Sequence, residues 1–151
     1  MPIFFMTDLA MEKVEKQDIK TFDDIKNLVD SFYNLVRKDE LIGPIFDETI
    51  GDGWDEHLPK MYSFWQTILL GEHTYTGAPF VPHMNLPIDR PHFEVWIGYW
   101  YQTVDELFSG SIAEEAKWRA SRMREVFLDK LDYIRNSPNF RGLVWGNMSK
   151  L

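Results

Sequence analysis

The sequence contains no cysteine among its 151 residues, and this absence excludes several kinds of site at once. Disulfides, thiolate metal centres and cysteine nucleophiles all require the missing side chain. Any metal ligand must therefore come from histidine, methionine, tyrosine or a carboxylate.

Positive charge is also scarce, because 16 basic residues stand against 24 acidic ones and the formal net charge is −8. Nucleic-acid phosphates and anionic membrane surfaces are bound by cationic surfaces, so neither partner is expected. No window of 18 apolar residues is present, and the amino-terminal sequence lacks the basic leader of a signal peptide. We therefore expect no transmembrane helix and a cytoplasmic protein.

Aromatic side chains, in contrast, are abundant: 11 Phe, 6 Tyr and 6 Trp make up 15% of the chain. The length and the 44% hydrophobic content suit one globular domain with a sizeable core. Aromatic residues at this density either fill an ordinary core or line a pocket for a flat apolar ligand. Composition alone favours the ordinary core.

The alternation of apolar and polar residues that is typical of strands is almost absent, and apolar residues recur at helical spacing instead. The pattern predicts an all-α fold with a turn at residues 43–44. Gly71 is expected to end the second helix, and Ser111 with Glu114 has the spacing of a capping box for the fourth. We expect four main helices. The first follows Thr21 as its N-cap, and the second begins near Leu58. The third begins at Pro91 and the fourth at Ser111.

Residues 72–91 form a connection that is rich in proline, and its stretch 80–87 contains one histidine, His83. Each proline fixes its own φ angle and removes a backbone donor, so this connection should be stiff but irregular. It has room for at most a short helix near residues 80–85. Its prolines are Pro79, Pro82, Pro87 and Pro91.

The four histidines do not have the helical HExxH spacing of a zinc protease. His73 and His92 flank helix ends, where we expect exposed caps. His57 is predicted at the edge of the second helix, facing the apolar side, and the following helix could place His83 across a shared cavity. A histidine is more often a satisfied core residue than a ligand. However, a single histidine among aromatic residues is also how haem iron is commonly held.

Two further polar groups fall on apolar helix faces. Tyr33 lies on the apolar side of the first helix, where its phenol needs either a backbone carbonyl or a functional partner. Trp96 brings an indole N–H to the inner face of the third helix. No nucleophile elbow and no glycine-rich phosphate loop is present, so neither a serine hydrolase nor a nucleotide site is expected.

Four segments in order, FYNLVRKDELIGPIF, WDEHLPKMYSFWQTILLG, YTGAPFVPHMNLP and FEVWIGYW, resemble the truncated haemoglobins, and within them group III. The Gly-Gly pairs of the other two groups are missing. The resemblance covers roughly residues 20 to 135. It implies a globin-like two-over-two helical sandwich around haem b, with the proximal histidine on the proline-rich connection. The expected division is an N-terminal extension (1–19), a truncated-globin domain (20–136) and a C-terminal tail (137–151).

The resemblance also implies roles for individual residues. It makes His83 the iron ligand and places Tyr33, His57 and Trp96 on the distal side, with Phe46 against the porphyrin. The implied pocket lining is Leu58, Met61, Trp65, Leu86, Phe93 and Ile97. Candidate partners of the haem propionates are Lys60, Tyr75, Arg90 and His92.

The implied function is reversible binding or transport of O2 and related diatomic ligands such as NO. NO dioxygenase or peroxidase-like activity stays open and requires a separate reductase, because nothing visible in the sequence binds flavin or nicotinamide. His57 is either a gate or a second iron ligand, and a monomer or weak oligomer is expected. From the residues alone, two alternatives stay open: a cofactor-free helical interaction module, and a non-haem ligand-binding protein that uses His57 and His83.

Overall fold

A computed structural model describes residues 15–137, and between these limits the chain is helical with irregular connections and no strand. The predicted all-α class is confirmed. The predicted extension (1–19) and tail (137–151) lie mostly outside the described residues. The elements are α2 (Phe22–Val36), α3 (Gly43–Ile50), α4 (Trp54–Leu70), the 3-10 helix η1 (Val81–His83), α5 (Arg90–Leu107) and α6 (Ser111–Arg135).

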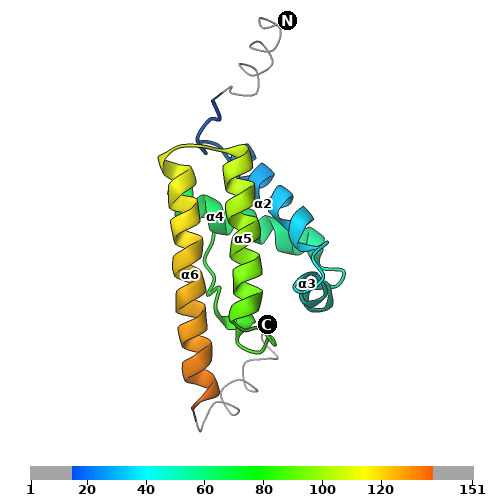
Figure 1. Cartoon of the computed structure of the whole chain (residues 1–151). Helices are drawn as coiled ribbons and strands as arrows, with labels where there is room; N and C mark the ends of the chain where they lie inside the picture. The colour runs from blue at the N-terminus through cyan, green and yellow to red at the C-terminus, as the bar shows by residue number, and fades with distance from the viewer. Residues whose placement is uncertain (1–14, 138–151) are drawn as a thin grey trace, which may run out of the picture.

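The four long helices form two packed pairs, α2 with α4 and α5 with α6. Helix α2 also packs on α5, and α4 on α6, which joins the pairs into a sandwich. Figure 1 shows α5 and α6 side by side, with η1 and its connection at the end of the molecule where α5 begins. None of the helices within residues 15–137 combines the length and apolar character needed to cross a membrane.

Helix α2 follows its sequence pattern closely. Residues Ile25, Leu28 and Phe32 recur at helical spacing and are at most 2% exposed. The predicted cap at Thr21 is confirmed: its hydroxyl accepts a hydrogen bond from the Asp24 amide at 3.1 Å. The Asp24 carboxylate accepts one from the Thr21 amide in return, which completes a capping box.

Helix α4 begins at Trp54, and the predicted start near Leu58 is wrong. Pro59 lies inside the helix, where its missing N–H costs a single hydrogen bond while its exposed ring points to solvent. The first turn forms because the Gly53 carbonyl accepts the His57 amide at 2.8 Å. His57 is therefore part of a regular helical turn.

Helix α3 replaces the predicted turn at residues 43–44. Pro44 occupies a position in the first turn where a missing donor has no cost. Gly43 lies so close to the end of α2 that a Cβ atom there would be 2.8 Å from the Arg37 carbonyl oxygen. This close approach requires glycine and holds α3 against the end of α2.

The predicted capping box of α6 is also wrong. Gly110 is the N-cap, and the first amides are satisfied from a distant part of the chain. The Asp18 carboxylate accepts from the amides of Ile112 at 3.0 Å and Ala113 at 2.9 Å. Asp18 is 94 residues from Ile112, so no local pattern could identify this cap.

Substituting Asp18 with alanine should lower the free energy of unfolding by about 0.5–2 kcal/mol, the usual cost of losing a helix N-cap. Urea titration followed by circular dichroism measures this change. Ser111→Ala is the matched comparison and should cost less, because Ser111 is not the N-cap. A larger loss of unfolding free energy in Ser111→Ala than in Asp18→Ala would instead identify Ser111 as the principal cap.

Candidate functional site

Tyr33 of α2 meets three aromatic rings from α3 and α4. The Tyr33 hydroxyl lies 3.3 Å from Nε2 of His57. Edge-to-face contacts join the Tyr33 ring to Phe46 at 5.8 Å, Trp54 at 5.4 Å and His57 at 5.6 Å. We call these four residues the tyrosine cluster. The partner of the buried phenol is thus a histidine side chain, not a backbone carbonyl.

The titratable groups of the tyrosine cluster are held neutral by their surroundings. Burial raises the pKa of Tyr33 well above its ordinary value of 10.0. Burial, followed by the positive charge of Lys60, lowers the pKa of His57 below 6.5, and His83 acts in the same direction when it is protonated. The pair is therefore a phenol with an uncharged imidazole at neutral pH.

The ring signals of His57 should titrate by NMR with a midpoint below 6.5. Lys60→Gln should raise this midpoint by removing a nearby positive charge, whereas Lys26→Gln, on the exposed side of α2, should not. Because the folded-state pKa lies below the unfolded value, stability from the neutral imidazole is complete above pH 6.5. It is lost as the pH falls through the folded-state pKa. Identical midpoints in both variants would contradict the assignment of Lys60.

The side chain of His83, at the end of η1, is held by a backbone carbonyl of the preceding turn. Its Nδ1 atom lies 2.6 Å from the carbonyl oxygen of Pro79. Burial lowers the pKa of His83, against the opposite effect of that carbonyl, so the ring is neutral. An imidazole that donates from Nδ1 presents the lone pair of Nε2, and Nε2 has no hydrogen-bond partner within the described chain. This is the state in which histidine binds a metal.

The His83 ring is packed on an aromatic ring of the second half of α6. The His83 ring lies 5.0 Å from the ring of Phe127, which also contacts Phe80 at 5.3 Å and Phe93 at 6.4 Å. These contacts restrict how far the imidazole can turn. The short predicted helix near residues 80–85 is confirmed as η1, three residues long.

In the described part of the chain the hydrophobic core consists of two clusters, and the predicted pocket residues are divided between them. Met123 packs against both clusters. Phe46, Leu58, Met61 and Trp96 are half-buried against the larger cluster, to which the buried Trp65 and Ile97 belong. Phe93 is buried in the smaller cluster, and the half-buried Leu86 packs against it.

Trp96 is connected to the tyrosine cluster through one ring. Phe32 lies edge-to-face with Trp96 at 6.0 Å and with Tyr33 at 5.0 Å. The Trp96 indole N–H has no acceptor among residues 15–137, although the ring is half-buried. Tyr33 and His57 are thus in contact, and the Trp96 indole lies beyond the Phe32 ring that touches Tyr33.

Trp54 is a member of this site that the sequence analysis did not identify. It is 8% exposed, and its Nε1 is the single buried side-chain polar atom without a hydrogen-bond partner in the described part of the chain. The Arg37 guanidinium lies 4.3 Å from the centre of its ring. An unpaired buried donor costs about 1–3 kcal/mol, so it fits a site that receives a polar ligand or water. The available signal was its position one turn before His57, once α4 is known to begin there.

The remaining histidines lie apart from this site. Nδ1 of His92 accepts from the Asp89 amide at 3.0 Å, which confirms its predicted capping role. His73 is exposed. Of the candidate propionate partners, Arg90 lies 3.6 Å from Glu94 and 3.5 Å from Glu125 in exposed ion pairs.

The residues present fit haem. The flat, apolar porphyrin ring of haem suits this core, because the core has two separate clusters and half-buried aromatic and aliphatic side chains pack against both. The macrocycle supplies most of the ligands to its iron, so one neutral histidine such as His83 suffices on the protein side. A two-layer helical sandwich with this arrangement of histidine, phenol and indole defines a small protein of the globin class.

Comparison with known proteins supports this class. The bacterial-like globin family model matches residues 17–127. The chain belongs to the bacterial-like globin family. It is 33% identical over 113 residues to the group 3 truncated hemoglobin ctb of Campylobacter jejuni, spanning 72% of this chain and 89% of that protein. The crystal structure of the group III truncated hemoglobin from Campylobacter jejuni matches with a TM-score of 0.71 and 32% identity, over 77% of this chain and 94% of that one. The resemblance to group III truncated haemoglobins is therefore confirmed.

Proposed function

We propose that the chain binds haem b through Nε2 of His83 and binds O2 and related diatomic ligands on the side of the tyrosine cluster. The observation that carries the proposal is the Nδ1 contact between His83 and Pro79, which leaves a neutral Nε2 without a partner among the described residues, 15–137. Membership of the globin family independently implies haem. Haem, when bound, supplies an iron atom with an open coordination position for a diatomic ligand.

The distal groups stabilise a ligand that carries partial negative charge. If Nε2–H of His57 donates to the Tyr33 oxygen, the Tyr33 hydroxyl hydrogen is free to donate to the ligand. The indole N–H of Trp96 offers a second donor. Each such hydrogen bond contributes about 0.5–1.5 kcal/mol, and more when the acceptor is charged. Two donors should therefore slow the release of the ligand.

The proposed site also includes apolar side chains and the ammonium group of Lys60. Phe46, Leu58 and Met61 contribute half-buried apolar surface suited to the faces and edges of the porphyrin. Lys60 is exposed one turn of α4 beyond His57, and no ion pair occupies it within residues 15–137. We propose Lys60 and Tyr75, with Arg90 and His92, as the candidates for the propionates.

Haem titration tests this function. Purified protein should bind one equivalent of haem with a sharp Soret band, and its ferrous form should bind carbon monoxide and O2 reversibly. A cofactor-free interaction module would show no saturable Soret band after reconstitution. A non-haem ligand-binding protein would fail in the same way and would bind its ligand through His57 and His83.

Turnover of NO or peroxide is a second proposal, and the neutral imidazole of His57 beside Tyr33 supports it, because such a group can accept and return a proton. Mixing the oxygenated protein with NO in a stopped-flow instrument, with and without a reducing system, separates catalysis from storage. Nitrate formed over many turnovers supports an enzyme served by a reductase; a single turnover supports a binding protein. The cytoplasmic location and the monomeric or weakly oligomeric state stay predictions.

A further inference from the structure

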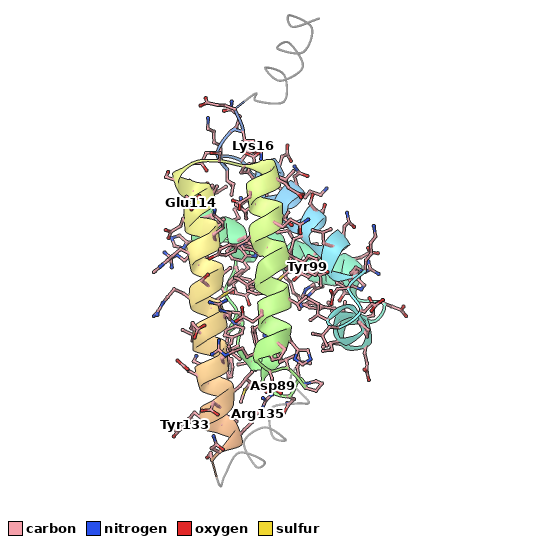
Figure 2. All side chains as sticks on the ribbon, viewed as in Figure 1. Lys16, Asp89, Tyr99, Glu114, Tyr133 and Arg135 are labelled. Atoms are coloured by element: carbon pink, nitrogen blue, oxygen red, sulfur yellow. The ribbon has the colours of Figure 1, made fainter. Side chains whose placement is uncertain are left out.

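Arg135, the last residue of α6, binds the chain segment that follows His83. Its Nη2 donates to the carbonyl oxygens of Leu86 at 3.1 Å and Ile88 at 2.9 Å. Its Nη1 lies 2.6 Å from Oδ1 of Asp89, the N-cap of α5. Figure 2 shows Arg135 and Asp89 together at the end of the molecule where α6 ends and α5 begins.

These contacts reach the backbone of His83 through two hydrogen bonds. The Leu86 amide donates to the His83 carbonyl at 3.2 Å, and the Arg135 guanidinium holds the Leu86 carbonyl. Pro82 and Pro87 have no N–H, so the segment cannot satisfy its carbonyls as a regular helix does. The Leu86 carbonyl accepts from the Ile88 amide at 2.8 Å, and the Arg135 side chain adds a donor from another helix to the Leu86 and Ile88 carbonyls.

The second half of α6 already supports the same segment by packing. Phe127 and Leu131 of α6 form the smaller core cluster with Ile88, and Leu86 packs against it. Lys130 lies 5.1 Å from the centre of the Phe80 ring, just before η1. Arg135 adds polar contacts to this apolar packing. Its planar guanidinium makes all three contacts at once, which an ammonium group cannot reproduce.

We propose that Arg135 is a positioning residue for the iron ligand: it fixes residues 84–89 and thereby the direction in which the His83 imidazole faces the haem. The inference rests on the proposed haem function. It assigns Arg135 no contact with haem or with the diatomic ligand. The orientation of an iron ligand is set by the groups that hold its own backbone and ring, as in other metal sites.

Two variants and one control test this role. Arg135→Gln removes the charge and the fork of donors, and Arg135→Lys keeps the charge but loses the fork. Arg119→Gln is the control, since Arg119 lies on α6 and pairs with Glu115 in an exposed contact of 2.7 Å. The readouts are the rate of haem transfer to a scavenger apoglobin, the iron–histidine stretching band in resonance Raman spectra, and amide hydrogen exchange of residues 84–89 without haem.

Arg135→Gln should accelerate haem transfer about tenfold, as expected for the loss of charge-assisted hydrogen bonds. It should also shift or broaden the iron–histidine band and speed exchange at residues 84–89. Arg135→Lys should show the same changes to a smaller extent, and it keeps the test valid if Arg135→Gln does not fold. The control should leave all three readouts at the values of the parent protein.

The outcomes separate this inference from the proposed function. If the parent protein shows an iron–histidine band and both Arg135 variants keep its position, the haem transfer rate and the exchange rates, the positioning role is wrong while haem binding stands. If the parent shows no such band, the proposed iron ligand is wrong. Exchange in the haem-free chain then still decides whether Arg135 holds the segment.

Discussion

Replacement of His83 by alanine is expected to abolish stable haem binding. Nε2 of this neutral imidazole is the proposed bond between protein and iron, and the Pro79 carbonyl and Phe127 ring hold it in place. Loss of an outer-shell partner alone commonly costs 10- to 100-fold in metal affinity, so we expect loss of the ligand itself to cost about 100-fold or more. The rate of haem transfer to a scavenger apoglobin and the Soret spectrum measure this effect.

His73→Ala is the matched control, because His73 is exposed and its removal should leave haem binding unchanged. His83→Gly with added imidazole tests whether the missing group alone explains the loss, since free imidazole can replace the ligand without a covalent connection. A normal five-coordinate ferrous spectrum in His83→Ala would show that another residue binds the iron.

Tyr33→Phe should increase the rate of O2 dissociation by about tenfold or more, because the ligand loses a hydrogen bond to a partly charged acceptor. The substitution keeps the ring and its contacts with Phe46 and Trp54, so packing changes little. Stopped-flow displacement of O2 by carbon monoxide measures the rate. Tyr101→Phe is the control, since Tyr101 is 37% exposed on α5 and lies outside the tyrosine cluster.

The same variant leaves Nε2 of His57 without the Tyr33 oxygen. His57 can then move, so the coordination state of the ferric form should be recorded alongside the rate. Combining Tyr33→Phe with Trp96→Phe completes a double-mutant cycle, and two donors to the same ligand should give a non-additive result. An unchanged dissociation rate in Tyr33→Phe would place the phenol out of reach of the ligand.

The sequence predicted the features that depend on neighbouring residues. The apolar repeat of α2 involves side chains three or four positions apart, its N-cap Thr21 directly precedes that repeat, and the prolines around His83 restrict the backbone wherever they occur. The short helix at η1 and the cap formed by His92 belong to the same kind of local information.

Features that depend on distant residues were not predictable in this way. The position of Asp18 against Ile112 results from tertiary packing. Helix α4 begins early because a proline in its second turn is tolerated on the exposed side, and this displacement hid Trp54. The Tyr33–His57 contact joins residues 24 positions apart, so the polarity of Tyr33 was apparent from the sequence but its partner was not.

The contact between Asp18 and α6 bears on where the folded unit can be cut. A protein shortened to residues 20–136 would lack the carboxylate that satisfies the first amides of α6. It would also lack Ile19, which is 1% exposed in the larger core cluster, and the Gln17 carbonyl that accepts the Ser109 amide at 3.0 Å. The smallest autonomous globin unit of this chain therefore includes residues 17–19, and an expression boundary placed after them would remove part of the fold together with the extension.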